Sequence, residues 1–417
     1  MNGNYKKFLL LWSGECISSI GGGLTSFGLG VYVFWQTHSA ANMALVTLLA
    51  FLPTLLFSVP AGVLADRYDR RLLMMLGDGC SAIGILYILI HLWRGDAGMS
   101  VICLGVFISA VFASLLEPAY RATISDLLSE EEYSKASGLV SLAGSARYLI
   151  SPLLAGILLT VGTIEWLLCI DIATFVVTVA TTAFVRKGLA SKKKEAKEPM
   201  MTALKKGWEA VTDNGGVFVL ILVSSVMTCF MGVLQILAEP LVLDFADSTT
   251  LGIAETICAS GMLVSSVFLG IKGIKRSYVK VLSVSIFIAG AAMAGFGCKE
   301  QLAWICVMGF LFFAMLPFAN NCLDYLVRIN IPRELQGRAW GFIGFLSQIG
   351  YVIAYGGAGI ITDSIAVHRK ISVGRGAGMV IVIAGILLSV TGVMLYQIRS
   401  VRNLEKGNKM EGQNGLE

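Results

Sequence analysis

The chain has 417 residues, of which 56% are hydrophobic and 14% charged, and its formal net charge is +5. Soluble domains average about 45–50% apolar and about 25% charged residues, so this composition excludes an ordinary soluble protein and indicates a polytopic membrane protein. A span needs about 20 residues, so the length allows roughly twelve spans and no appended soluble domain. Basic loops explain the positive charge, and no basic groove with interleaved aromatic residues indicates nucleic-acid binding.

Apolar segments of membrane-spanning length follow one another along the chain, and each is predicted to be a transmembrane helix. They lie near residues 8–34, 42–65, 72–93, 98–120, 136–160, 164–185, 216–242, 250–271, 278–297, 301–327, 337–361 and 376–398.

The longest polar interruption, residues 186–215, is rich in lysine and separates six predicted spans from the next six. We expect an N-terminal half over 1–185, a cytoplasmic linker over 186–215, a C-terminal half over 216–398 and a polar tail over 399–417. Within the linker, residues 201–211 predict a short amphipathic helix.

The first span carries Glu15 two turns inside the membrane and a run of glycines at Gly21–Gly23. An ionisable side chain in lipid is costly, so Glu15 is expected to face the protein interior or a cavity. The glycines predict either close approach of a neighbouring helix or a flexible break in the span.

A short charged turn, G-V-L-A-D-R-Y-D-R-R, joins the second and third spans at residues 62–71. Such a turn must lie at the water boundary. Asp66 falls near the C-terminal end of a helix, where the macrodipole disfavours an anion, so we expect it to bond a loop arginine or the N-terminus of another helix. On spacing alone, a plain cytoplasmic loop would look similar.

This turn resembles the signature loop of the major facilitator superfamily, G-x-L-x-D-R-x-G-R-R, between helices 2 and 3. The matching residues are Gly62, Leu64, Asp66, Arg67, Arg70 and Arg71. Asp69 replaces the usual glycine, which is similar to the macrolide-efflux branch of the drug:proton antiporters. The resemblance implies that Gly62, Asp66, Arg67, Arg70 and Arg71 form a gating motif that clamps helix ends in one transport state.

Residues 117–156 carry the next features of that resemblance. E-P-A-Y-R ends the fourth span, a polar segment follows, and the fifth span holds Arg147 and S-P-L-L-A-G at 151–156. This order resembles the family's helix-5 motif, with Pro152 and Gly156 matching and Ser151 in place of a glycine. Pro152 is expected to kink the helix, because proline removes one backbone hydrogen bond.

The second half repeats the first at a distance of about 200 residues. Pro317-Phe318 and P-R-E-L-Q-G-R at 332–338 echo Pro118-Ala119 and S-E-E-E-Y-S-K at 129–135. The sequence thus predicts an all-α membrane protein with twelve transmembrane helices in two six-helix pseudo-repeats. The resemblance implies the major facilitator fold with a central cavity.

The distribution of the 32 Lys and Arg residues predicts the orientation. Outer loops hold only Arg94, Lys299, Arg369, Lys370 and Arg375, and Arg147 lies inside a span. The remainder fall in segments on one side, so both termini are expected in the cytoplasm of a multi-pass protein of the cell membrane.

Enzymatic motifs are missing from the sequence. It contains neither a G-x-x-x-x-G-K-[ST] loop nor H-E-x-x-H, and its nine cysteines form no C-x-x-C pair. We therefore expect no enzymatic activity, no cofactor and no metal site. The candidates for chemistry are ionisable residues within the spans: Glu15, Glu117, Arg147, Asp171, Glu239, Glu255 and Asp324.

For several of these candidates, a role at the membrane boundary or in packing, without a part in transport, is an open alternative. Glu117 and Asp324 lie near span ends and are equally well read as boundary residues, and Asp171 as a structural hydrogen-bonding residue. Arg147 cannot be deprotonated in practice, so it needs a carboxylate or carbonyl partner for either transport or packing.

The resemblance implies proton-coupled efflux of amphipathic, drug- or macrolide-like small molecules by a functional monomer in the lipid bilayer. Export of a native metabolite or siderophore, and a non-transporting membrane sensor or scaffold, stay open as alternatives. No histidine lies at membrane depth, so the expected proton carrier is a buried carboxylate, with Glu15 first and Glu117 and Asp171 next.

Overall fold

The computed structural model describes residues 3–128, 130–186, 208, 212, 215–274, 277–331 and 333–405. Within these ranges, the side chains of residues 3, 59, 66, 130–131, 133–135, 137–138, 141–142 and 333–342 are outside the description. Most of the expected linker at 186–215, including its amphipathic helix, falls outside it as well. The domain boundaries drawn from the sequence therefore stay predictions.

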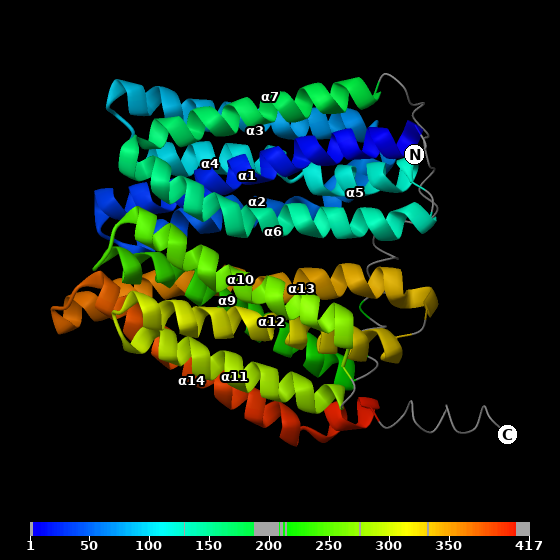
Figure 1. The fold of residues 1–417 in the computed structure, drawn as a ribbon, viewed down its shortest axis with the longest axis vertical. Coiled ribbons are helices and arrows are strands. Elements are labelled where there is room, and N and C mark those ends of the chain that lie inside the picture. Colours follow the sequence, from blue (N-terminus) through cyan, green and yellow to red (C-terminus); the bar gives the residue numbers. More distant parts are fainter. Residues whose placement is uncertain are drawn as a thin grey trace. The chain divides into compact units, whose positions relative to one another are not determined.

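Helices make up nearly all of the described residues, and no strand occurs among them (Figure 1). In chain order they are α1 (Gly3–Thr37), α2 (Ala40–Arg67), α3 (Arg70–Arg94), α4 (Met99–Ala113), α5 (Leu116–Leu127), α6 (Glu130–Val161), α7 (Ile164–Arg186), α9 (Gly215–Leu243), α10 (Ser248–Lys272), α11 (Tyr278–Cys298), α12 (Leu302–Asn330), α13 (Arg333–Arg369) and α14 (Val373–Gln397).

Twelve of the described helical segments are long and apolar enough to cross a membrane, and α4 with α5 makes one of them. Each coincides with one of the spans predicted from the sequence. A helix satisfies its backbone hydrogen bonds internally, which lipid requires of any spanning segment. The predicted all-α membrane fold with twelve transmembrane helices is confirmed.

The helices extend further than the apolar segments indicate. We expected the fourth span to end near residue 120 and a polar connection to follow, but α5 continues to Leu127 and α6 begins at Glu130. Glutamate, lysine and alanine are good helix formers, so the polar flanks continue the helix beyond the apolar part. The fourth span is also broken, since α4 ends at Ala113 and α5 begins at Leu116.

The chain divides into two compact units: unit 1 is Met1–Lys197 with Ala246–Thr256, and unit 2 is Glu198–Phe245 with Ile257–Glu417. In unit 1, α1 packs against α6 and α7, while α3 packs against α4 and α7. In unit 2, α9 packs against α13 and α14, while α11 packs against α12 and α14. The two packing schemes correspond helix by helix, as expected for parallel repeats.

Glycines bring helix backbones together in unit 2. Gly290 and Gly297 of α11 face α14, where Gly378 and Gly385 lie opposite. A Cβ added at Gly385 would meet the backbone N of Ala294, and one at Gly297 would meet the carbonyl oxygen of Gly378. Lipid tails are as apolar as leucine, so close van der Waals packing of this kind is what holds membrane helices together. We call this contact the glycine seam.

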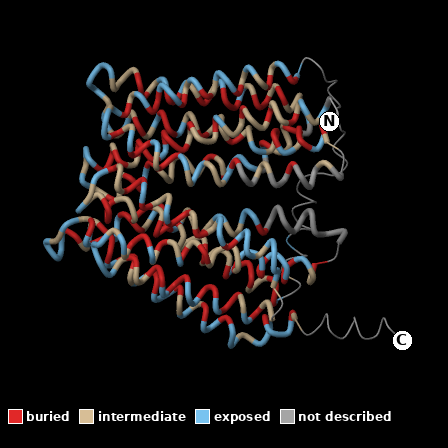
Figure 2. Tube along the Cα trace, in the orientation of Figure 1, coloured by how far each residue is buried: buried red, intermediate tan, exposed pale blue. Residues whose placement is uncertain are grey.

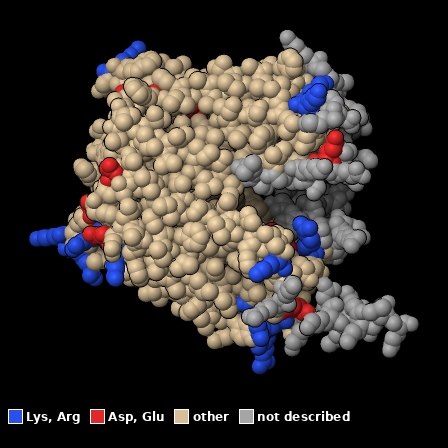
Figure 3. Space-filling view, viewed as in Figure 1, with Lys and Arg blue, Asp and Glu red and all other residues tan. Residues whose placement is uncertain are grey.

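Burial and charge follow the arrangement expected of a membrane protein. Buried residues lie where helices of one unit face each other, and exposed ones lie on the outer faces and in the loops (Figure 2). On the face seen in Figure 3, neutral side chains cover the flanks of the helices, and the described Lys, Arg, Asp and Glu side chains gather at helix ends. The lipid-length part of each unit is therefore nearly free of charge on this face.

Candidate functional site

The arginines of the α2–α3 turn bind the end of α5. Arg70 Nη1 lies 2.8 Å from Asp126 Oδ1 and donates to the Ala122 carbonyl oxygen at 3.0 Å. Arg71 is buried, and its Nη2 lies 3.9 Å from Asp126 Oδ2. One carboxylate therefore holds two of the three arginines of the predicted gating motif, and the sequence alone did not predict this connection.

Asp69, which stands where the family pattern has glycine, makes two interactions. Its Oδ1 accepts a hydrogen bond from the Arg71 backbone N–H at 3.1 Å and caps the N-terminus of α3. Its Oδ2 accepts a hydrogen bond from Arg186 Nε at 2.8 Å. The departure from the family pattern thus adds a helix cap and a connection to α7. Asp69, Arg70, Arg71, Asp126 and Arg186 are called the turn cluster below.

The other residues of the gating motif contribute less to the described contacts. Arg67 is exposed at the end of α2. A Cβ added at Gly62 would meet nothing within 4 Å, so packing does not demand glycine there. The side chain of Asp66 lies outside the described residues, and its expected bond to an arginine or a helix N-terminus stays a prediction.

An apolar core supports the turn cluster. It joins the start of α1, through Phe8 and Leu11, to Leu73 and Met74 of α3 and to Val185 of α7. All five side chains are buried, with Phe8, Leu11, Met74 and Val185 fully inaccessible. The ion pairs of the turn cluster therefore lie beside packed helix ends rather than on a loose loop.

A second group of charged side chains lies at membrane depth in unit 1. Glu15 of α1 interacts electrostatically with Glu117 of α5 and with Arg147 of α6. Its Oε2 atom is buried and receives no hydrogen bond from any residue that the structure describes. Three of the residues expected to carry coupling are therefore brought together around α1.

Glu117 and Arg147 both have exposed side chains in unit 1. Glu117 pairs with Arg121 one turn further along α5, where Arg121 Nη2 lies 2.7 Å from Glu117 Oε1. Arg147 Nη2 donates to Ser26 Oγ of α1 at 3.4 Å, which is a long hydrogen bond. A guanidinium has five N–H donors, so Arg147 has donor capacity beyond this one bond.

Asp171 of α7 is buried and well bonded. Thr25 of α1 donates its hydroxyl to Asp171 Oδ2 at 2.6 Å, and Thr174 Oγ1 lies 3.5 Å from Oδ1. A Cβ added at Gly21 would meet Thr174 Oγ1 and Asp171 Oδ1, so this glycine allows α1 to approach α7. The geometry favours the structural role considered for Asp171.

The glycine run of α1 serves close approach and does not break the helix. α1 is continuous from Gly3 to Thr37. A Cβ added at Gly23 would collide with the side chain of Ser151 on α6, whose hydroxyl donates to the Ile20 carbonyl oxygen at 3.0 Å. Ser151, where the family motif has glycine, therefore joins α6 to α1.

The helix-5 motif packs against the first residues of α10, which belong to unit 1. A Cβ added at Gly156 would meet the carbonyl oxygen of Ser248, and one added at Gly252 would meet that of Pro152. Thr256 Oγ1 also donates to the Leu149 carbonyl oxygen at 2.9 Å. Pro152 and Gly156 thus shape a close backbone contact and lack the chemistry of a binding group.

The remaining candidates lie on other helices. Glu239 belongs to α9 of unit 2, and its Oε2 atom is buried. Glu255 lies on α10, and Asp324 of α12 interacts electrostatically with Arg328. One turn before Glu239, Gln235 Oε1 accepts a hydrogen bond from Tyr355 Oη at 2.6 Å. Neither Gln235 nor Tyr355 was expected from the sequence, because neutral polar residues do not stand out within apolar spans.

Asp78 of α3 was also missing from the expected set. It is only 2% exposed and interacts electrostatically with Glu15 and Asp171. The signal was present, since the sequence G-D-G-C places a single aspartate within the span predicted at 72–93. The rule that selected Glu15, an ionisable residue inside an apolar span, selects Asp78 equally well.

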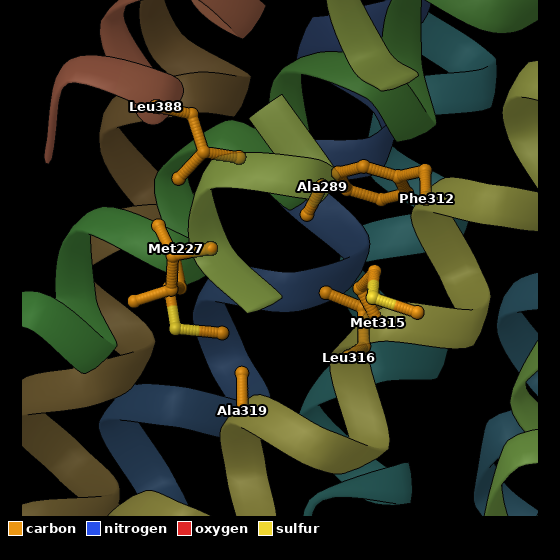
Figure 4. A pocket seen from close by; sticks show the side chains of 8 residues that line it. Met227, Ala289, Phe312, Met315, Leu316, Ala319 and Leu388 are labelled. Carbon is orange, nitrogen blue, oxygen red and sulfur yellow. The ribbon is translucent and has the colours of Figure 1, made fainter. Parts of the chain in front are cut away.

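Unit 2 encloses a small apolar cavity between Met227, Phe312, Met315 and Leu388 (Figure 4). Its volume of about 10 Å³ is comparable to the space of one water molecule. Sites for drug-sized ligands occupy about 300–1,000 Å³, so this cavity is a packing defect and not a substrate site. The described residues also contain no group of three or more His, Cys, Asp or Glu side chains placed to hold a metal ion.

Comparison with known proteins gives a consistent result along most of the chain. The family model described as Major Facilitator Superfamily matches residues 11–355. Macrolide efflux protein A of Streptococcus pyogenes is 24% identical over 414 residues, covering 96% of this chain and 98% of that protein. Enterobactin exporter EntS of Salmonella typhimurium is 25% identical over 394 residues, covering 92% of each.

Solved structures of similar fold include a bacterial homologue of the human lysosomal transporter Spinster, in an inward-facing and unoccupied conformation. It is 14% identical, has a TM-score of 0.74, and the match covers 96% of this chain and 98% of that chain. The nucleoside transporter NupG is 14% identical with a TM-score of 0.71, covering 96% and 100%. At this identity the likeness concerns the fold.

Proposed function

Since this chain belongs to the Major Facilitator Superfamily, a family of membrane transporters that are not enzymes, we propose that it exports amphipathic small molecules in exchange for protons. Macrolide efflux protein A, which matches nearly the whole chain, supports the choice of macrolide-like substrates. The observation that carries the proposal is the position of Glu15 in a membrane span, with a buried, unbonded oxygen and electrostatic links to Glu117 and Arg147. A carboxylate so placed destabilises the protein, and this cost favours a functional role for Glu15 over a purely structural one.

In the proposed cycle, Glu15 alternates between its protonated and ionised forms. Burial favours the protonated form, while approach of the Arg147 guanidinium favours the ionised form. Movement of α6 relative to α1 would change the distance between these two groups, and so load or release the proton. Among the described residues, Arg147 makes one long hydrogen bond, to Ser26, which is consistent with such movement.

Purified protein in liposomes with an acidic lumen provides the test, because protons leaving the lumen should drive a radiolabelled macrolide inward. Protein-free liposomes correct for passive trapping of a weak base. We expect a protonophore to abolish accumulation. Glu15→Gln should abolish it too, while retaining exchange of labelled for unlabelled macrolide. Asp96→Asn, in an exposed loop of unit 1, is the matched control and should accumulate normally.

Accumulation that survives the protonophore but requires sodium would contradict proton coupling. Normal accumulation by Glu15→Gln would exclude Glu15 as the carrier, and Glu117 would be the next residue to test. Enterobactin is the second probe, since the relative named as an enterobactin exporter supports export of a native compound of this kind. Transport of neither probe class would favour a sensor or scaffold.

We also propose that the α2–α3 turn acts as a gate, because two of its arginines are bonded to the end of α5. Asp66→Asn keeps the shape of the side chain and removes its charge. It is expected to reduce transport sharply while the protein stays folded in the membrane. A wild-type transport rate in this variant would contradict the gating role.

The proposed location is the cell membrane, with both termini in the cytoplasm, on the basis of the distribution of Lys and Arg. A single cysteine at position 193, in a protein without its nine native cysteines, should resist an impermeant maleimide applied to intact cells. A single cysteine at position 98, in the loop between α3 and α4, should react. The opposite labelling pattern would reverse the orientation.

A further inference from the structure

Asp78 lies within α3, in a membrane span and away from both helix ends. It is 2% exposed, and no described residue donates a hydrogen bond to its buried Oδ2 atom. Asp171 shows the contrasting case of a buried carboxylate that accepts a hydroxyl hydrogen bond at 2.6 Å. An aspartate kept only for structure needs such donors, since a buried polar group without them destabilises the fold.

The glycines next to Glu15 and Asp78 both contact one turn of α7. Gly14 precedes Glu15, and its carbonyl oxygen accepts a hydrogen bond from Thr178 Oγ1 at 3.3 Å. Gly79 follows Asp78, and a Cβ added there would lie 3.8 Å from Val179 Cγ2. Gly14 and Gly79 therefore contact consecutive residues of α7, which puts Glu15 and Asp78 at the same level along that helix.

The charged groups around Asp78 are mainly acidic. Glu15 reaches it from α1 and Asp171 from α7, where Asp171 lies two helical turns, or about 10 Å, before Thr178. Arg147 of α6 interacts with both of these carboxylates.

The other helices packed against α3 offer little positive charge near Asp78. α4 contains no Asp, Glu, Lys, Arg or His, and the charged residues of α2 are at its end, at positions 66 and 67. On α5, Glu117 pairs with Arg121, and Asp126 binds the two arginines at the start of α3. Those arginines are two turns away from Asp78.

An ionised Asp78 would thus be buried, without a donor at Oδ2 among the described residues, and in the electrostatic field of two other carboxylates. Each of these conditions favours the neutral, protonated acid. When two carboxylates interact electrostatically, ionisation of one opposes ionisation of the other. Ionisation of Glu15 would therefore strengthen the binding of a proton at Asp78.

We propose that Asp78 is a second proton-carrying residue, which exchanges the transported proton with Glu15; this inference rests on the proposed proton-coupled function. In the step, the Glu15 acid loses one proton as the Asp78 carboxylate gains it, and no electrons move. Asp78 then holds the proton away from Arg147, whose positive charge would otherwise expel it from Glu15. Asp78 thus stores the proton behind the exposed Arg147.

Infrared difference spectroscopy of the full-length protein in lipid, recorded as a function of pH, tests the inference without a substrate. We expect the wild type to show a titrating C=O band of a protonated carboxylic acid that Asp78→Asn removes and Asp96→Asn keeps. Glu15→Gln should move the midpoint of this band to lower pH, because a neighbouring negative charge is gone. A band unchanged by Asp78→Asn, or a midpoint unchanged by Glu15→Gln, overturns the proposal.

A variant that keeps the carboxyl group guards against loss of folding in Asp78→Asn. Carbon-13 labelling of aspartate side-chain carboxyls should shift the band of the wild type, while the corresponding band of Asp78→Glu stays unshifted. Equal shifts in both proteins would assign the band to another aspartate and overturn the proposal.

Transport measurements separate this inference from the proposed function. In liposomes, Asp78→Asn should lose proton-driven macrolide accumulation at least tenfold and keep exchange of labelled for unlabelled macrolide. If the wild type fails to transport the macrolide but shows the band, the substrate is wrong and the role of Asp78 stands. If the wild type is proton-coupled and Asp78→Asn is equally well coupled, the role of Asp78 is wrong and the proposed function stands.

Discussion

Asp69 Oδ2 lies 2.8 Å from Arg186 Nε, so the turn after α2 is bonded to the last turn of α7, the final helix of the first repeat. The same carboxyl group caps α3 through the Arg71 backbone N–H. A glycine at position 69, as in the family pattern, would allow neither interaction. In this protein, one residue therefore joins the turn to two helices of unit 1.

The two roles of Asp69 can be separated by substitution. Asp69→Asn keeps a capping oxygen and loses the ion pair, which is partly exposed and worth about 0–1 kcal/mol. Asp69→Ala loses the cap as well, which adds about 0.5–2 kcal/mol. We expect the melting temperature in detergent to fall more for Asp69→Ala than for Asp69→Asn. Arg186→Ala removes only the ion pair, so it should lower the melting temperature as much as Asp69→Asn does. Equal losses for Asn and Ala at position 69 would refute the capping role.

Removal of the Asp126 charge should loosen the turn cluster. Arg71 is 3% exposed, so Asp126→Asn leaves a buried guanidinium with a neutral neighbour. Breaking a fully buried pair costs about 3–5 kcal/mol, and the partial exposure of Asp126 reduces this to about 1–3 kcal/mol. The melting temperature and the rate of macrolide transport should both fall, whereas Asp96→Asn should leave both unchanged. A melting temperature equal to that of the wild type would show that the arginines find other partners.

The glycine seam predicts that one methyl group is enough to disturb unit 2. A Cβ at Gly290 would press on the backbone N of Ser389, so Gly290→Ala should destabilise by about 1–3 kcal/mol. Gly62→Ala is the matched control in α2, where a Cβ would meet nothing within 4 Å, and it should gain about 0.5–1 kcal/mol from helix propensity. Melting temperatures of the two variants should move in opposite directions; similar shifts would contradict this account of the seam.

Thr25 determines whether Asp171 is held as a structural group. Thr25→Val removes the hydroxyl that donates to Asp171 Oδ2 and should cost about 1–3 kcal/mol, while Thr25→Ser keeps the donor and should cost less. The difference should grow with rising pH, because an ionised carboxylate needs the donor more than a protonated one does. Thermal unfolding at several pH values provides the measurement. A pH-independent difference would argue that Asp171 does not change its ionisation state over the pH range measured.

The fold could be predicted from the sequence because the thickness of the bilayer fixes the length of each spanning helix. About 20 apolar residues per span were enough to place every membrane helix, and the excess of Lys and Arg on one side predicted an orientation. Helix ends were less accessible, since Glu130 and its neighbours continue a helix that hydropathy would end. The break between α4 and α5 at Ser114–Leu115 lies four residues before Pro118, which cannot donate to the Ser114 carbonyl oxygen, so the sequence carried a signal for this break that the predicted span did not use.

The sequence predicted most residues of the candidate site but not which of them contact one another. Glu15 and Arg147 stood out as charges within apolar segments, and the Glu117–Arg121 pair has the helical spacing of four residues. The bond between Arg70 and Asp126 joins residues far apart in sequence, and only packing of α3 against α5 brings them together. Asp78 was accessible by the same rule as Glu15.

The glycine seam has a consequence for how this sequence can change over generations. In an ordinary core, a larger residue on one helix can be offset by a smaller one opposite. Where Gly290 faces Gly385, each is already the smallest residue, and no exchange on the partner helix creates room. A single substitution in the glycine seam therefore cannot be compensated by a second one on the opposite helix. The α11–α14 pair should retain its glycines in descendants whose turn cluster has exchanged its charges for other pairs.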